Sequence, residues 1–215
     1  MTEPARMTYQ AQLRKQVFTT IMQEYRWGET HLSGGGSAIE VTAGARRILE
    51  YVILTYDIRS MLDIPCGDFS WMPLMLARLP DVFHYIGSDI VLELIQRNRH
   101  IHPSRDFRVI DLVTDALPVC DLIFCRDALQ HLPLDNIMKA LDNMSHSGAK
   151  YLLTTTHLRQ HGWRNRRSSR MGSCRDRNLL LPPFSLPDPI MIFSEQAPGH
   201  KFLGLWTLPF QYEYH

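Results

Sequence analysis

The sequence predicts an α/β protein with an open, mostly parallel sheet, helices on both faces of the sheet and a C-terminal antiparallel hairpin. The first observation is a series of short apolar segments, most of which end in polar or acidic residues. The second is that stretches with helical or loop character separate these segments, as expected for parallel strands joined by crossovers. The third is the composition, because 215 residues with 45% hydrophobic and 21% charged residues suit one globular domain. The predicted strands cover residues 60–64, 85–89, 107–111, 121–125 and 151–156.

Three helices are predicted from apolar residues that fall on one helical face. The first covers residues 41–52, and the second covers 71–79 with Pro73 in its first turn, where proline is tolerated. The third covers 134–144 and follows Pro133, a residue type that is common at helix starts. Alternating helices and strands predict a sheet covered on both faces, and ligands bind outside the carboxyl ends of the strands in such sheets.

The two ends of the chain depart from this alternation. Residues 182–189 contain too many prolines for a helix or a central strand. The apolar segments 190–193 and 202–208 then predict the closing hairpin. At the other end, we expect residues 1–40 to form a helix and a Gly-rich lid, and residues 41–215 to form the main domain.

The composition also excludes several classes of protein. The four cysteines have no CxxC spacing, which favours free thiols, and no cysteine or histidine pairs have the spacing of a metal site. No apolar run approaches the roughly 20 residues that span a bilayer. The N-terminus lacks the apolar core of a secretory signal. The sequence therefore predicts a cytoplasmic protein that needs neither a membrane nor a metal.

A tight turn around Gly67 follows the first predicted strand, which ends near Asp63. Such a turn lets the backbone approach a ligand closely, as in Rossmann-like nucleotide-binding folds. Asp89 follows Gly67 by 22 residues, a spacing at which an acidic residue accepts hydrogen bonds from ribose hydroxyls. Pro65 and Phe69 stand where a dinucleotide motif has glycines, which argues against an NAD-dependent dehydrogenase. The alternative to a cofactor site is a strand-turn-helix joint that binds nothing.

These residues resemble the class I S-adenosylmethionine-dependent methyltransferases. The first motif of that superfamily matches Asp63-Ile-Pro-Cys-Gly67, and its next two acidic residues match Asp89 and Asp111. The likeness spans about residues 48–156. Further stretches, among them Asp-x-Pro-Cys-Gly-Asp-Phe and Leu-Gly-Leu-Trp206, look like a little-characterised subgroup of small methyltransferases. The resemblance implies S-adenosylmethionine as the cofactor and leaves the substrate open. The cofactor-binding residues that it implies are Asp63, Pro65, Cys66, Gly67, Asp89, Ile90, Asp111, Leu112 and Arg126.

Methyl transfer needs a nucleophile that is close, aligned and usually deprotonated. His131 follows the fourth predicted strand and is the candidate general base, because histidine can take up a proton near neutral pH. The alternative is that His131 only packs against its helix or caps it. Asp127 and Arg126 could orient His131, hold the substrate or form a structural ion pair. His157 is a second base candidate. A hydroxyl oxygen is the preferred methyl acceptor because it would suit His131.

The Gly-rich segment, residues 33–37, could form a lid whose backbone amides meet a carboxylate, or it could be a hinge. Trp27 and Arg46 would border the same opening if the N-terminal helix folds over it. Arg177 lies at the end of a basic stretch that would project as a loop near the site. The predicted substrate-binding residues are Trp27, Ser37, Arg46 and Arg177.

The basic stretch from Arg159 to Arg177 contains seven arginines and one aspartate, although the whole chain has a net charge of only +1. It could bind an anionic small molecule or remain a solvated loop. The same stretch is the basis of an alternative hypothesis, in which the protein methylates or binds a nucleic acid. That alternative is less favoured because Trp163 is the only aromatic residue in the stretch. A third hypothesis is a partner protein that binds S-adenosylmethionine without catalysis. The leading one is an enzyme that methylates a small molecule.

Overall fold

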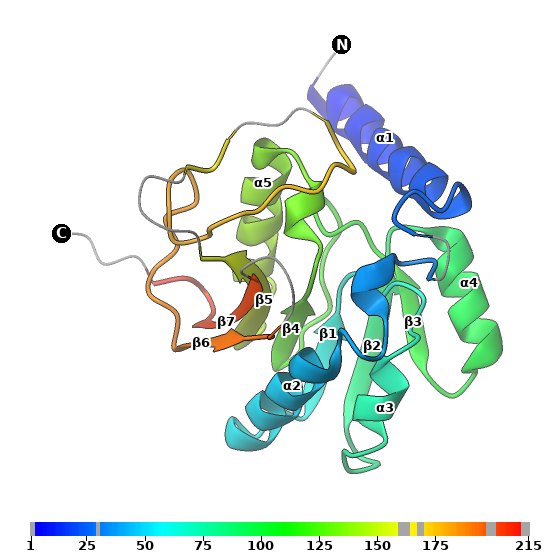
Figure 1. The fold of residues 1–215 in the computed structure, drawn as a ribbon. Coiled ribbons are helices and arrows are strands. Elements are labelled where there is room, and N and C mark those ends of the chain that lie inside the picture. The colour runs from blue at the N-terminus through cyan, green and yellow to red at the C-terminus, as the bar shows by residue number, and fades with distance from the viewer. Residues whose placement is uncertain (1–2, 29–30, 159–163, 167–169, 197–200, 212–215) are drawn as a thin grey trace.

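A seven-stranded sheet lies at the centre of the protein, with the strand order β3-β2-β1-β4-β5-β7-β6 (Figure 1). The computed structural model describes residues 3–28, 31–158, 164–166, 170–196 and 201–211. The first five strands run parallel, and β7 is antiparallel to both β5 and β6. The predicted parallel sheet and the C-terminal hairpin are thus confirmed. The strands are β1 (Ser60–Asp63), β2 (His84–Asp89), β3 (Asp106–Val109), β4 (Leu122–Cys125), β5 (Tyr151–His157), β6 (Met191–Ser194) and β7 (Lys201–Thr207).

Helices join three pairs of neighbouring parallel strands, β1 to β2, β2 to β3 and β4 to β5, whereas the described residues between β3 and β4 contain no helix. The described elements are α1 (Glu3–Gln23), α2 (Ala43–Thr55), α3 (Met72–Leu76), α4 (Leu92–Ile101) and α5 (Leu134–Ser145), with short 3-10 turns η1 (Gly35–Ser37) and η2 (Leu129–His131). Helix α3 is shorter than the predicted helix at 71–79. Helix α4 was not predicted, because only Leu94, Ile95 and Asn98 of its ten residues are buried and the rest are mainly polar.

Apolar residues fill both faces of the sheet, because neighbouring residues in a strand point to opposite faces. In β1, Met61 belongs to a core cluster with α2 and α3, whereas the next residue, Leu62, belongs to a cluster with α5. Both side chains are fully buried. Each such side chain contributes about 1.5–3 kcal/mol of burial free energy. The two clusters therefore hold helices on both faces and fix the register of the strands between them.

The carboxyl ends of the central strands lie together at one edge of the sheet. Asp63 of β1 pairs in register with Gly87 of β2 and with Phe124 of β4. This register places the polar residues at the ends of three separate strands within one region, although they are far apart in the sequence. The edge is the place where an α/β sheet binds its ligands.

Helix α1 crosses above this edge and is joined to it by the Gly-rich segment (Figure 1). The division of the chain at residue 40 stays a prediction. No helix in the described part of the chain combines the length and the apolar character needed to cross a membrane.

Candidate functional site

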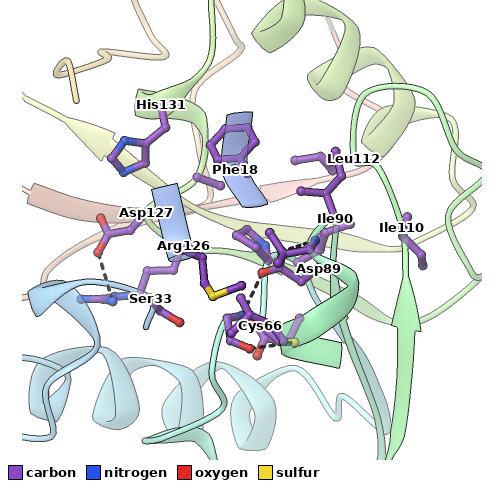
Figure 2. A pocket seen from close by; sticks show the side chains of 18 of the residues that line it. Phe18, Ser33, Cys66, Asp89, Ile90, Ile110, Leu112, Arg126, Asp127 and His131 are labelled. Carbon is purple, nitrogen blue, oxygen red and sulfur yellow. Dashed lines mark hydrogen bonds and ion pairs between the residues drawn. The ribbon is translucent and has the colours of Figure 1, made fainter. Parts of the chain in front are cut away.

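A pocket lies between α1 and the carboxyl ends of the parallel strands, and it encloses about 1060 Å³ of empty space, part of it open to solvent (Figure 2). Most of the predicted site residues line it, so the fold brings together residues that the sequence separates by up to about a hundred positions. The lining residues that were predicted are Trp27, Ser37, Asp63, Pro65, Cys66, Gly67, Asp89, Ile90, Asp111, Leu112, Arg126, Asp127 and His131.

Asp89 occupies the wall of the pocket at the end of β2. Its Oδ2 accepts a hydrogen bond from the Gly67 backbone N–H at 3.2 Å, and its Oδ1 accepts one from the Val91 N–H at 2.9 Å. Burial raises the pKa of the Asp89 carboxyl to about 6, and the backbone hydrogen bonds oppose this rise. The group is therefore ionised at neutral pH and loses its charge in mildly acidic solution. A carboxylate has about four acceptor positions, so one remains beyond those used by the backbone N–H groups of Gly67, Val91 and Ile90.

The turn that follows β1 is held in one shape by several contacts. Gly67 has a φ of 56°, a backbone conformation that glycine adopts without steric cost. A Cβ at this position would lie 2.2 Å from Oγ of Ser33. That same Oγ accepts the Asp68 N–H at 2.6 Å, and the Asn98 side chain donates to the Gly67 carbonyl at 2.8 Å. A glycine is therefore required both for the turn and for the approach of the Gly-rich segment.

Asp63 lies deeper, beneath the same turn. The Tyr85 hydroxyl donates a hydrogen bond to its Oδ2 at 2.7 Å. Burial raises the pKa of Asp63 to about 8, although the Tyr85 hydrogen bond and the Arg126 charge lower it. At neutral pH this carboxyl group is mostly protonated, so it differs from Asp89 in charge although both line the pocket.

Asp111 is paired with Arg14 from helix α1. The guanidinium Nη2 lies 2.7 Å from Oδ2, and Nε donates to both carboxylate oxygens at 3.1 and 2.9 Å. The two side chains are almost completely buried. This pair ties α1 to the end of β3 and so closes one side of the pocket. Sequence reasoning missed Arg14, together with Phe18 and Met22 on the same helix face, which also line the pocket. Their spacing of four residues was the available signal.

Four charged side chains form a buried network at the end of β4. Arg126 lies 2.9 Å from Glu195 and 3.1 Å from Asp127, while Lys201 lies 2.8 Å from Asp127 and 3.6 Å from Glu195. Arg126 also donates to the Gly36 carbonyl at 3.0 Å, which fastens the Gly-rich segment to the sheet. Burial favours a neutral Asp127, but the Arg126 and Lys201 charges prevail and lower its pKa to about 2. Glu195 and Lys201 were not predicted.

His131 lies in η2 and stacks on Trp27, with 4.4 Å between ring centroids and 33° between ring planes. Its Nδ1 is buried and has no hydrogen-bond partner among the described residues. Burial lowers the pKa of His131 to about 4, although the Asp127 charge and a hydrogen bond with the Ser173 backbone raise it. The imidazole is therefore neutral at pH 7, and one ring nitrogen is available as a hydrogen-bond acceptor.

Three predicted site residues do not line the pocket. His157 accepts the Arg177 N–H through Nδ1 at 3.2 Å, and burial lowers its pKa. Arg177 is buried and donates to the carbonyls of Arg166 and Leu132. Arg46 borders a separate surface groove with α3 and donates to Thr42 and to the Ile39 carbonyl.

The basic stretch is described only in part, because residues 159–163 and 167–169 lie outside the described residues. Its later part folds back over the site. The Gly172 N–H donates to the His131 carbonyl at 2.8 Å, and the Trp27 indole donates to the Gly172 carbonyl at 3.3 Å. The Arg175 N–H donates to the Gln130 carbonyl at 3.1 Å. This part of the stretch therefore contacts η2 and Trp27 rather than projecting as a loop.

Neither a protein-family model nor a curated protein sequence matches this chain. Solved structures do match. Human N-acetylserotonin methyltransferase in complex with S-adenosylmethionine shares 14% identity at a TM-score of 0.59, over 92% of this chain and 56% of that one. The N-methyltransferase NodS from Bradyrhizobium japonicum, in complex with S-adenosylhomocysteine, shares 12% identity at a TM-score of 0.62, over 89% of this chain and 98% of that one. An O-methyltransferase family protein from Burkholderia thailandensis shares 13% identity at a TM-score of 0.57, over 79% of this chain and 57% of that one.

This chain thus spans little more than half the length of the first and third of these proteins. At these identities the comparison establishes the fold. The chain has the Rossmann-like fold of S-adenosylmethionine-dependent methyltransferases, as the resemblance of its motifs predicts.

Proposed function

We propose that this protein is an S-adenosylmethionine-dependent methyltransferase that acts on a small molecule. The observation that carries the proposal is the buried, ionised Asp89 carboxylate beside the Gly67 turn, in a pocket at the carboxyl ends of the strands. Proteins of the same fold hold S-adenosylmethionine or S-adenosylhomocysteine, as the first and second matched structures do. The fold shared with these structures supports an equivalent use of the pocket here.

The pocket residues fit an adenosyl cofactor. Asp89 can accept a hydrogen bond from a ribose hydroxyl, because a carboxylate has about four acceptor positions and the backbone N–H groups of Gly67, Val91 and Ile90 use three of them. Ile90 and Leu112 line the pocket next to it and offer apolar surface to an adenine ring. S-adenosylmethionine, when bound, supplies a methyl group on a positively charged sulfur. In this proposal Asp89 holds the sugar, and Cys66 and Gly67 form the floor beneath it.

His131 is proposed to act as the general base that accepts the proton of the methyl acceptor. In this role the acceptor hydroxyl would donate a hydrogen bond to Nδ1, and that nitrogen would take up the hydroxyl proton. The Trp27 ring and the Ser173 backbone fix the orientation of the imidazole. Asp127 is a positioning residue in this proposal, because both of its oxygens already accept hydrogen bonds from Gln130 and Lys201.

Isothermal calorimetry with S-adenosylmethionine and S-adenosylhomocysteine tests the cofactor assignment. Both should bind, and Asp89→Ala should weaken binding at least tenfold, which corresponds to about 1.4 kcal/mol. Asp106→Ala is the matched control, because Asp106 is an exposed aspartate on the neighbouring strand β3. The absence of both heat and thermal shift with either ligand would reject the proposal. Binding that is unchanged in a folded Asp89→Ala variant would reject the role of Asp89.

The nucleic-acid alternative gains no support from the arginines that line the pocket. Arg14 and Arg126 are each engaged with buried carboxylates, so neither is free to contact a phosphate. Arg177 is buried as well. A partner protein that binds the cofactor without catalysis remains the second candidate, and turnover of an acceptor distinguishes it from the enzyme.

A further inference from the structure

One end of the pocket has the properties of a separate binding subsite, built by His131, Trp27, Phe18, Ala128 and Leu132. Four of these five side chains are apolar or aromatic. In Figure 2, His131 and Phe18 are drawn on the side of the pocket away from Cys66, and Asp127 lies below His131. This end is therefore distinct from the wall formed by Asp89 and its neighbours.

The His131 nitrogen gives this subsite one unsatisfied polar atom. Nδ1 is buried and has no partner among the described residues. A buried acceptor that lacks a hydrogen bond has lost its hydration without compensation, so it is less stable in free energy than a satisfied one. Trp27 prevents the imidazole from turning away, because it stacks on the ring and is itself anchored to the Gly172 carbonyl. A ligand that donates a hydrogen bond at this point would recover that free energy.

Two aromatic rings extend from the imidazole, because Trp27 stacks on His131 and Phe18 contacts Trp27. The Trp27 and Phe18 ring centroids lie 6.0 Å apart with 57° between their planes, which is an ordinary tilted aromatic contact. Leu132 and Ala128 complete the lining. Flat apolar surfaces of this kind favour a planar ring over a bulky saturated one, because a ring can stack closely on them.

The charges of the pocket disfavour an anionic ligand. Among the described lining residues, each arginine already has a carboxylate partner: Arg14 pairs with Asp111, and Arg126 pairs with Glu195 and Asp127. The Asp127 carboxylate also lines the pocket, and its negative charge acts on His131. A carboxylate or phosphate would lose its hydration here without gaining a free cation in exchange.

We propose that this subsite takes a neutral, planar aromatic hydroxyl compound, with its O–H donated to Nδ1 of His131 and its ring against Trp27 and Phe18. The assignment rests on the proposed function, since it names the acceptor class of the same site. Chemistry points the same way. A phenolic hydroxyl has a pKa of about 10, as in tyrosine, whereas the pKa of an aliphatic hydroxyl is far higher, close to that of water. A buried, weakly basic imidazole assists loss of the first proton far more readily than loss of the second.

Three naphthalene-derived probes of similar size test this assignment by calorimetry, with and without saturating S-adenosylhomocysteine. They are 1-naphthol, the saturated alcohol 1-decalol and the anion 1-naphthoate. We expect 1-naphthol to bind at least tenfold more tightly than either of the others. Equal or tighter binding of 1-decalol or 1-naphthoate, or no binding of 1-naphthol, overturns the proposal. Cofactor binding is measured separately, so a protein that fails to bind S-adenosylhomocysteine contradicts the proposed function instead.

A variant pair locates the binding. His131→Phe keeps an aromatic ring but removes Nδ1, and we expect it to weaken 1-naphthol binding at least tenfold while S-adenosylhomocysteine binding stays within twofold. His146→Phe is the matched control, because His146 is exposed at the end of α5, outside the pocket. Trp27→Leu provides a second variant that removes the aromatic wall and should also weaken 1-naphthol binding. Unchanged 1-naphthol affinity in both folded pocket variants overturns the assignment.

Discussion

Replacing Glu195 by glutamine should destabilise the protein strongly, although the two side chains have nearly the same shape. The Glu195 side chain is completely buried and lies 2.9 Å from Arg126 and 3.6 Å from Lys201. Glu195→Gln leaves these two buried cations with Asp127 as their remaining anionic partner. Removing one member of a buried ion pair typically costs 3–5 kcal/mol, and we expect about 3 kcal/mol because glutamine can still accept one hydrogen bond.

Urea unfolding measured by circular dichroism gives this free energy directly. For a chain of this size, 1 kcal/mol corresponds to about 2–4 °C in melting temperature, so the expected decrease is about 6–12 °C. Asp106→Asn is the matched control, because it breaks an ion pair with Arg108 whose two side chains are 44% and 46% exposed. Exposed pairs contribute about 0–1 kcal/mol. If Glu195→Gln is no less stable than Asp106→Asn, the buried network does not stabilise the fold.

Three further results are expected. Arg14→Gln leaves the buried Asp111 carboxylate without its cation. Hydrogen exchange in α1 should therefore accelerate at least tenfold while the central strands stay protected. Equal exchange in the wild-type protein and the variant would show that the pair does not hold α1. S-adenosylmethionine affinity should fall about tenfold from pH 7.5 to pH 5, because Asp89, with a pKa of about 6, takes up a proton and loses acceptor capacity; a flat calorimetric profile contradicts this. Tyr85→Phe removes the donor to Asp63 and should lower the unfolding free energy by about 1–3 kcal/mol, and unchanged urea stability would show that this bond contributes little.

The amino-acid pattern was sufficient to predict the sheet, its closing hairpin and much of the pocket wall. The periodicity of strands and helices is a local property. A buried face recurs every two residues in a strand and every three to four residues in a helix, whichever element packs against it. The ends of parallel strands must meet at one edge, so Asp63, Asp89 and Asp111 could be grouped without knowing any contact. The motif around Gly67 led us to expect S-adenosylmethionine as the cofactor. The solved methyltransferase structures then matched this chain in fold.

Only the tertiary structure decided which charged groups are free to act. Glu195 follows β6 and Lys201 begins β7, yet they pair with Arg126 and Asp127, which lie 69 and 74 residues earlier. Similarly, Arg14 reaches Asp111 across 97 residues. The free energy of such a pair depends on burial and on distances of a few ångströms, which arise when distant segments pack together. For the same reason Arg46, Arg177 and His157 looked like site residues in the sequence, while the packed chain places them outside the pocket.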